Sequence, residues 1–128
     1  MARRELVLVA CPERELLERL SEEIIAGGRR PLLTRDGDAA VRLAIESQPA
    51  MAVVDADLAS MSGHLLVSRL RRLPSFRTAP IVLVSADDGI AHLRLGTDAG
   101  ATEVIPRPIG HDEIARRMRR HLAPVRRS

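Results

Sequence analysis

The sequence predicts a single α/β domain with a parallel sheet and helices on both of its faces. Five short apolar runs alternate with five amphipathic stretches of helical length, which is the pattern of repeated βα units. The apolar runs are hydrophobic at nearly every position, which is typical of strands buried on both faces. A chain of 128 residues fits one domain, with a core at about 5–122 and a basic tail at 123–128.

The order of the elements follows from these runs and from the prolines and glycines between them. Strands are predicted at Leu6–Ala10, Pro31–Thr34, Met51–Asp55, Ile81–Ser85 and Thr102–Ile105. Helices are predicted at 12–26, 37–48, 62–73, 88–99 and 111–122. Gly27-Gly28 and Pro49 stop the first two helices, and Pro74 and Pro80 bracket the loop before the fourth strand.

The composition indicates a folded domain with an aliphatic core. Phe76 is the one aromatic residue apart from the histidines, and the single Cys11 excludes an internal disulfide. We find neither a signal-peptide pattern nor an apolar stretch of roughly 18 residues, so a cytoplasmic protein without a membrane span is expected. All 20 basic residues are arginine, so the pI of about 10.7 overstates a net charge of +3.

Chemistry in an open parallel sheet gathers at the carboxyl ends of the strands. The residues at or just beyond those ends are Ala10, Cys11, Asp55, Ser85 and Arg107. We therefore expect these side chains to lie on one rim of the domain.

Three segments are similar to signatures of the response-regulator receiver domain. They are VVDADLASMSG (53–63), APIVLVSA (79–86) and AGATEVIPRP (99–108), and they occur in the order and at the spacing of that family. The resemblance extends from Leu6 to Leu122. It implies a flavodoxin-like (βα)5 three-layer sandwich with strand order 2-1-3-4-5. It also implies a role in two-component (phosphorelay) signal transduction rather than an enzyme.

The resemblance assigns roles to individual residues. Asp55 matches the aspartate that accepts a phosphoryl group, and Ser85 and Arg107 match the phosphate-sensing hydroxyl and lysine positions. Gly63 matches the glycine after the aspartate loop. A cis peptide bond is expected between Arg107 and Pro108, where the family has a lysine before proline. Because Arg107 and Asp55 share a rim, we also predict an ion pair between them.

The chain departs from the family where a magnesium ion is bound. The adjacent acid pair after the first strand maps to Ala10 and Cys11, or to Val9 and Ala10, and neither placement supplies a carboxylate. We therefore expect no cofactor, with magnesium binding lost or very weak. Ala59 stands where the family usually has proline. Val104 replaces the aromatic residue that acts as a rotamer switch.

Three functions remain open from the sequence. The first is an atypical pseudo-receiver that binds a signalling protein, such as a histidine kinase or an output protein, without phosphorylation. The second is a working phospho-acceptor at Asp55. The third is a basic nucleic-acid adaptor. In the family, partner contacts and homodimers form through the fourth helix, fifth strand and fifth helix, which here carry Arg94, Asp98, Glu103 and Arg117.

Other polar residues have both a functional and a structural interpretation. Glu13 is a replacement metal ligand or, as we favour, a solvated acid in a first helical turn. Cys11 is either a low-pKa redox thiol or a small buried residue, and we favour the latter. The four histidines lack metal-ligand spacing and are expected at the surface: His64, His92, His111 and His121.

The last helix is rich in arginine. Ile114, Met118 and Leu122 recur every four residues and predict its buried stripe. The outer face and the tail then carry Arg116, Arg117, Arg119, Arg120, Arg126 and Arg127. Without aromatic residues to stack on bases, this basic face favours an acidic protein partner over nucleic acid.

Overall fold

A computed structural model describes residues 6–122 of the chain. The strands are β1 Leu6–Ala10, β2 Arg30–Thr34, β3 Met51–Asp55, β4 Ile81–Val84 and β5 Glu103–Ile105. The helices are α1 Arg14–Ala26, α2 Gly37–Ser47, α3 Gly63–Arg71, the 3₁₀ helix η2 Pro74–Phe76, α4 Ile90–Ala99 and α5 His111–Arg119.

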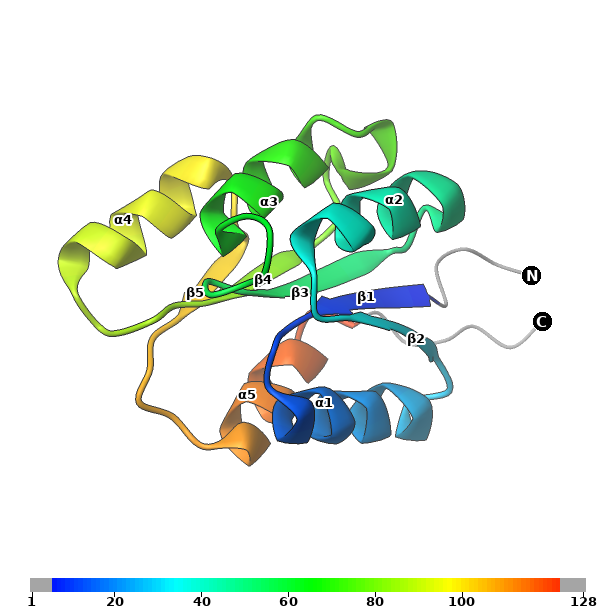
Figure 1. Ribbon diagram of the computed structural model, residues 1–128. Helices are drawn as coiled ribbons and strands as arrows, with labels where there is room; N and C mark the ends of the chain where they lie inside the picture. The colour runs from blue at the N-terminus through cyan, green and yellow to red at the C-terminus, as the bar shows by residue number, and fades with distance from the viewer. Residues whose placement is uncertain (1–5, 123–128) are drawn as a thin grey trace.

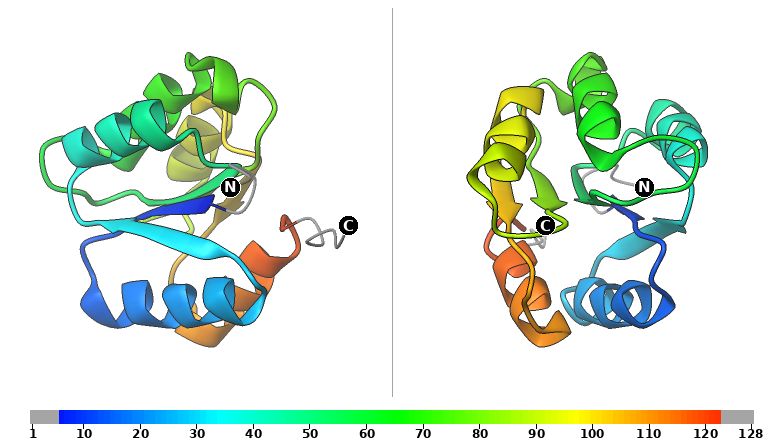
Figure 2. Two further views of the ribbon diagram at one scale, coloured as in Figure 1. Left: turned by 90° about the vertical axis from the view of Figure 1, so that its right-hand side faces the viewer. Right: turned by 60° about the vertical axis from the view of Figure 1, so that its left-hand side comes forward.

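The five strands form one parallel sheet in the order β2-β1-β3-β4-β5. Helices α2, α3 and α4 cover one face of the sheet, and α1 and α5 cover the other (Figure 1). Figure 2 shows the same three layers from two further directions. The predicted flavodoxin-like sandwich and its strand order are confirmed.

Two aliphatic cores hold the layers together. One lies between the sheet and α1 with α5, and the other lies between the sheet and the opposite helices. Every residue of β3 is buried, including Asp55 at its end. Phe76 is fully buried in the second core. The central strands β1, β3 and β4 are continuous apolar runs because both of their faces are covered, whereas the edge strands β2 and β5 are partly exposed.

The ends of the elements differ from the predicted ends by one to three residues. Helix α1 begins at Arg14 rather than at 12, because Glu13 has an extended backbone and serves as the N-cap. Helix α5 ends at Arg119 rather than at 122. The short 3₁₀ helix η2, which has Pro74 in its first turn, lies in the stretch that was predicted as a loop. The strand bounds differ by a single residue at β2, β4 and β5.

Between residues 6 and 122, no helix is long and apolar enough to cross a membrane. The basic tail at 123–128, with Arg126 and Arg127, lies outside the described residues.

Candidate functional site

The rim at the carboxyl ends of the strands brings together the residues that the sequence pointed to. β3 lies between β1 and β4 in the sheet, so Asp55 has Cys11 on one side and Ser85 on the other. Arg107 reaches the same place from the loop after β5, where its peptide bond to Pro108 is cis as expected. The strand order alone therefore assembles this group from four separate segments.

Asp55 is a buried carboxylate whose two oxygens both accept hydrogen bonds. Its side chain is only 4% exposed. The guanidinium of Arg107 donates to Oδ2 over 2.7 Å and to Oδ1 over 3.4 Å. The backbone N–H of Asp57 donates to Oδ1 over 2.9 Å, and the Cys11 thiol lies 3.5 Å from Oδ2. The predicted Arg107–Asp55 ion pair is confirmed.

Arg107 is held by more than one group. Its Nη1 atom also donates to the backbone carbonyl of Ser85 over 3.3 Å, and Glu13 lies 3.9 Å from Nη2. Burial opposes the charge of the guanidinium, but the hydrogen bond and the negative charge of Asp55 outweigh it and raise the pKa of Arg107. Arg107 therefore acts as a permanent positive charge beside Asp55.

Cys11 is a neutral, buried thiol. It is 2% exposed, and burial, together with the nearby Asp55 carboxylate, raises its pKa to about 12. The hypothesis of a low-pKa redox thiol is therefore wrong. Desolvation of the thiol outweighs the backbone hydrogen bond with Glu13 and the charge of Arg107, which both act to lower its pKa. At neutral pH the thiol can donate a hydrogen bond to Asp55.

The residues at this rim do not fit the magnesium ion of the receiver family. Magnesium prefers several oxygen ligands in octahedral geometry. Ala10 offers a methyl group, Cys11 offers a protonated thiol, and Asp55 already bonds Arg107 through both oxygens.

Ser85 and Gly63 complete the surroundings of Asp55. The Ser85 side chain is fully buried, and its Oγ atom has no hydrogen-bond partner among the described residues. Gly63 donates its N–H to the Ala56 carbonyl over 2.8 Å. A Cβ atom at Gly63 would collide with the backbone carbonyl of Asp55, so only glycine allows the loop to close this tightly.

The loop after Asp55 is fastened to the start of α2. Ala59, at the position where the family usually has proline, accepts a hydrogen bond from Gly37 N–H over 3.0 Å. Ser60 has a left-handed backbone (φ 72°), and its hydroxyl accepts from the N–H of Asp38. The pKa of Asp36 is lowered, first by a hydrogen bond with Ser60 and then by the N–H of Ala39. The loop is thus ordered without the proline.

Glu13 is exposed, but it has two charged neighbours. It bonds His111 Nε2 over 2.7 Å and faces Arg107. Among residues 6–122, the one group of three metal-ligating side chains close enough to share an ion is Glu13, Glu15 and His111. Because Arg107 and two helix N-termini place positive charge beside it, we interpret this group as an ion-paired cluster.

The four histidines are all partly exposed, and three of them pair with an acid. His92 pairs with Asp87 over 2.7 Å, and His121 pairs with Glu103 over 2.6 Å. His64 packs near His92. Asp87 lies close to His92 in sequence, whereas Glu103 is far from His121 and Glu13 is far from His111, so residue spacing gave no signal of the last two pairs.

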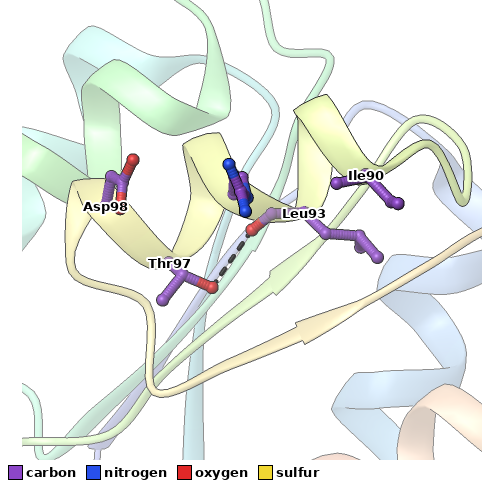
Figure 3. A pocket seen from close by; sticks show the side chains of 5 residues that line it. Ile90, Leu93, Thr97 and Asp98 are labelled. Carbon is purple, nitrogen blue, oxygen red and sulfur yellow. Dashed lines mark hydrogen bonds between the residues drawn. The ribbon is translucent and has the colours of Figure 1, made fainter.

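The predicted interaction residues lie around the β5 edge of the sheet. Figure 2 (right) shows α4 and α5 on either side of that edge. Arg94 and Asp98 line a shallow groove on α4 with Ile90, Leu93 and Thr97 (Figure 3). Glu103 lies 3.6 Å from Arg117. The four residues are thus divided between an α4 groove and a β5–α5 ion pair.

The basic face of α5 is partly neutralised within the domain. Ile114 and Met118 are buried as predicted, and Leu122 packs against the same core. Arg116 bonds Glu113, and the pKa of Glu113 is lowered chiefly by that hydrogen bond. Ion pairs with α1 and within α5 hold Arg117 and Arg119 as well. Less free positive charge remains for a nucleic acid than the sequence suggests.

The fold, with its buried aspartate at the end of β3, defines a receiver class of signalling domain. The family model of the response regulator receiver domain matches residues 11–119. The chain is 32% identical over 123 residues to the transcriptional regulatory protein KdpE of Mycobacterium tuberculosis. It is also 32% identical over 122 residues to the transcriptional regulatory protein TctD of Salmonella typhimurium. The alignments cover 96% and 95% of this chain. The chain belongs to the response regulator receiver domain family.

These relatives are longer proteins, since the chain spans about half of their length, 52% in both cases. Among solved structures, the chemotaxis protein CheY4 of Vibrio cholerae has a TM-score of 0.80 at 19% identity over 91% of this chain and 98% of that chain. The BeF3-activated DrrB receiver domain has a TM-score of 0.77 at 19% identity, over 91% and 96% of the two chains. Both support the fold.

Proposed function

We propose that this receiver domain is an atypical pseudo-receiver, a protein-interaction module whose signalling does not require magnesium-dependent phosphorylation of Asp55. The observation that carries the proposal is the way Asp55 is satisfied. Its two oxygens are bonded by Arg107, the Asp57 N–H and the Cys11 thiol, and Ala10 and Cys11 at the neighbouring end of β1 supply no carboxylate. Phosphoryl transfer relies on a cation to neutralise the charge that develops on the phosphoryl oxygens. Here the guanidinium of Arg107 supplies positive charge, but unlike a metal ion it cannot coordinate the phosphoryl oxygens.

The partner in this proposal is a signalling protein, either a histidine kinase or an output protein, in a cytoplasmic two-component pathway. Arg94, Asp98, Glu103 and Arg117 on the α4, β5 and α5 edge mix both signs of charge, as a specific protein interface does. A homodimer through the same edge is the other arrangement that this charge pattern supports. Charge reversal at Arg117 is expected to weaken association. Loss of binding from α1 substitutions alone would place the interface elsewhere.

A second candidate, a working phospho-acceptor, is favoured by one observation. The buried Oγ of Ser85 has no partner among the described residues and lies on the same rim as Asp55. A phosphoryl group on Asp55 would give this hydroxyl an acceptor and would keep Arg107 as its counter-charge.

The two candidates are separated by incubation with acetyl phosphate and magnesium, followed by intact-protein mass spectrometry. We expect no phosphoryl adduct on the wild-type chain. The double substitution Ala10→Asp and Cys11→Asp restores carboxylates next to Asp55 and is the positive control, and Asp55→Asn is the negative control. An adduct on the wild type that disappears in Asp55→Asn would establish the second candidate.

A nucleic-acid role is the weakest of the three functions, because acids of the domain pair several α5 arginines. Binding to DNA or RNA that falls steeply with salt would revive it. A flat response to salt would dismiss it.

A further inference from the structure

The arginines of the domain differ in whether the fold gives them an acidic partner. On α1 and α5, Arg19, Arg116 and Arg119 are all ion-paired with acids of the domain. A second group of arginines lies on α3 and η2, where no acidic residue occurs between Asp57 and Asp87. The two groups therefore differ in how much positive charge they offer to a partner.

Three exposed arginines lie at the carboxyl end of α3 and on the turn that follows it. Arg69 is in the last turn of α3, Arg72 is its C-cap, and Arg77 is the C-cap of η2. None of the three makes an ion pair with an acid among residues 6–122. This holds also for the exposed acids Glu46 and Asp98 on the neighbouring helices α2 and α4. We call these three arginines the α3–η2 surface.

Arg71 fixes the backbone beneath this surface. Its guanidinium donates to the carbonyls of Gly100 over 2.7 Å and Phe76 over 2.8 Å, and to the hydroxyl of Thr102 over 3.0 Å. These acceptors are neutral, so they do not cancel the charge of the guanidinium. Burial lowers the pKa of Arg71, and no carboxylate opposes that shift. Arg71 thus adds a further uncompensated positive charge at the same place.

Two buried side chains anchor the segment between the arginines. Leu70 and Phe76 are fully buried in the core beneath α3. The backbone between them closes successive turns, in which the Leu73 N–H donates to the Leu70 carbonyl over 2.9 Å and the Phe76 N–H donates to the Leu73 carbonyl over 3.0 Å. A backbone fixed in this way lowers the conformational entropy that is lost when the arginines bind a partner.

The dipole of α3 offsets only part of this charge. The carboxyl end of a helix carries about half a negative charge, which favours Arg69 and Arg71 in the last turn of α3. That effect falls off within the last turn, and Arg77 lies beyond it on η2. The positive charge of the arginines therefore exceeds the charge of the dipole, and the surplus is open to an anion from outside the domain.

The α3–η2 surface lies at the end of the domain opposite to Asp55. Segment η2 precedes β4 and so lies at its amino end, whereas Asp55 is at the carboxyl end of the parallel strand β3 (Figure 1). The surface also includes none of the residues of the proposed interaction edge, Arg94, Asp98, Glu103 and Arg117. It is therefore a separate place of contact.

We propose that the α3–η2 surface docks an acidic segment of a protein partner, a stretch rich in Asp and Glu side chains. Each guanidinium can hold a carboxylate through two hydrogen bonds. Complementary charge of this kind increases the rate and the specificity of association. The inference goes beyond the proposed function, because it does not involve the α4, β5 and α5 edge.

An acidic protein segment fits this surface better than a nucleic acid does. Arginine also binds phosphate, but proteins that bind single strands stack the bases on aromatic side chains. The chain has no Trp and no Tyr, and Phe76 is fully buried. Duplex DNA is held through many phosphate contacts along its length, whereas these arginines all lie within residues 69–77.

Fluorescence anisotropy of a labelled oligoglutamate peptide, titrated with the full chain at low ionic strength, tests the proposal. The test variant carries Arg69→Gln, Arg72→Gln and Arg77→Gln. The matched control carries Arg19→Gln, Arg116→Gln and Arg119→Gln. The control loses the same net charge, but from arginines that already have acidic partners. We expect the test variant to bind about tenfold more weakly, the effect of three exposed ion pairs, and the control to bind as the wild type does.

Other results would overturn the proposal. Equal weakening of both variants would mean that net charge governs binding, and a wild type that does not bind would mean that the surface holds no carboxylates. Binding of labelled oligothymidylate without binding of the peptide would assign the surface to nucleic acid. Self-association of the wild type that is lost in the test variant would make a second copy the occupant, through exposed acids such as Glu18 and Glu22 of α1.

Circular dichroism checks the fold of each variant. If the triple test variant does not fold, the single exposed substitution Arg77→Gln replaces it, with an expected loss of about twofold in affinity. Unchanged affinity in that variant would contradict the proposal. The assay uses no phosphodonor and leaves Arg94 and Arg117 in place, so a failure here leaves the proposed function standing.

Discussion

Arg107 supplies the positive charge that the buried Asp55 carboxylate requires. An unpaired carboxylate in this apolar rim would be strongly disfavoured, and the guanidinium fork removes that penalty with two hydrogen bonds. The resemblance predicted a cation at this position, and Arg107 is long enough to reach both oxygens. Cys11 adds a neutral donor on the other side. At the residue scale, the site is therefore an ion pair in which both oxygens of Asp55 have hydrogen-bond donors from the protein itself.

Substitution of Arg107 measures the strength of that pair. Arg107→Gln should lower the free energy of unfolding by about 1 to 3 kcal/mol, because Asp55 stays buried while Arg107, at 25% exposure, is only partly screened by solvent. Urea denaturation at neutral pH measures the change. Arg94→Gln, at an exposed arginine of α4, is the control and should have almost no effect. Equal effects of the two substitutions would show that the pair contributes nothing.

Ionisation of the Cys11 thiol should determine how the free energy of unfolding changes with pH in alkaline solution. The chain has no Lys and no Tyr, so the thiol is the one side chain expected to titrate between about pH 9 and 11. Its pKa is raised in the fold, so the stability it confers is complete below the unfolded pKa and is lost as pH rises towards the folded value of about 12. The free energy of unfolding should fall by about 1.4 kcal/mol per pH unit above about pH 9.

Denaturation curves from about pH 8 to 11 test this slope. Cys11→Ala changes packing at every pH but removes the titration, so its curve should be flat over the same range. A slope that persists in Cys11→Ala would assign the alkaline effect to another group.

At the scale of elements, helix α4 is held on the sheet by the close approach of its backbone rather than by a stripe of buried apolar side chains. A Cβ atom at Gly96 would lie 2.7 Å from Val104 and 2.8 Å from Leu83, so the helix packs on β4 and β5 through its backbone. Val104 stands where the family has an aromatic rotamer switch. The small side chain at 104 and the glycine at 96 fit each other.

Gly96→Ala should destabilise the domain although alanine is the better helix former. The propensity gain of about 1 kcal/mol is outweighed by overpacking, which costs typically 1 to 3 kcal/mol, for a net loss of about 1 kcal/mol. Thermal denaturation gives the measurement. Gly110→Ala is the matched control, because a Cβ there meets nothing within 4 Å and its φ of −75° suits any residue. Stabilisation by Gly96→Ala would mean that α4 shifts without cost.

At the scale of the whole molecule, the sheet order converts four separate segments into one rim. The rim has the geometry of a receiver but lacks the acid pair that would hold a cation. The ion pairs between α1 and α5 and the paired arginines of α5 are further products of this topology. Function at this scale is expected to depend on the α4, β5 and α5 edge.

Millimolar magnesium should leave the melting temperature of the domain unchanged. A ligand stabilises the folded state only as far as its concentration exceeds its dissociation constant. Ala10 and Cys11 offer no carboxylate, and Asp55 already bonds Arg107 through both oxygens, so we expect a large dissociation constant for magnesium beside Asp55. Differential scanning fluorimetry with and without magnesium checks this. The Ala10→Asp, Cys11→Asp variant should gain stability from the ion. An upward shift in the wild type would contradict the expectation.

The sequence by itself determined the five βα units, the strand order through its family resemblance, and the rim that joins Asp55 to Arg107. These features follow from local apolar runs and from motifs at strand ends, and each of these signals is contained in one short segment of the sequence. Only the tertiary structure decided which distant groups meet. Cys11 bonds Asp55, Glu13 bonds His111, and the rings of His64 and His92 approach each other, through separations that no period in the sequence encodes. The neutral state of the Cys11 thiol has the same origin, because burial is created by packing and not by the order of residues.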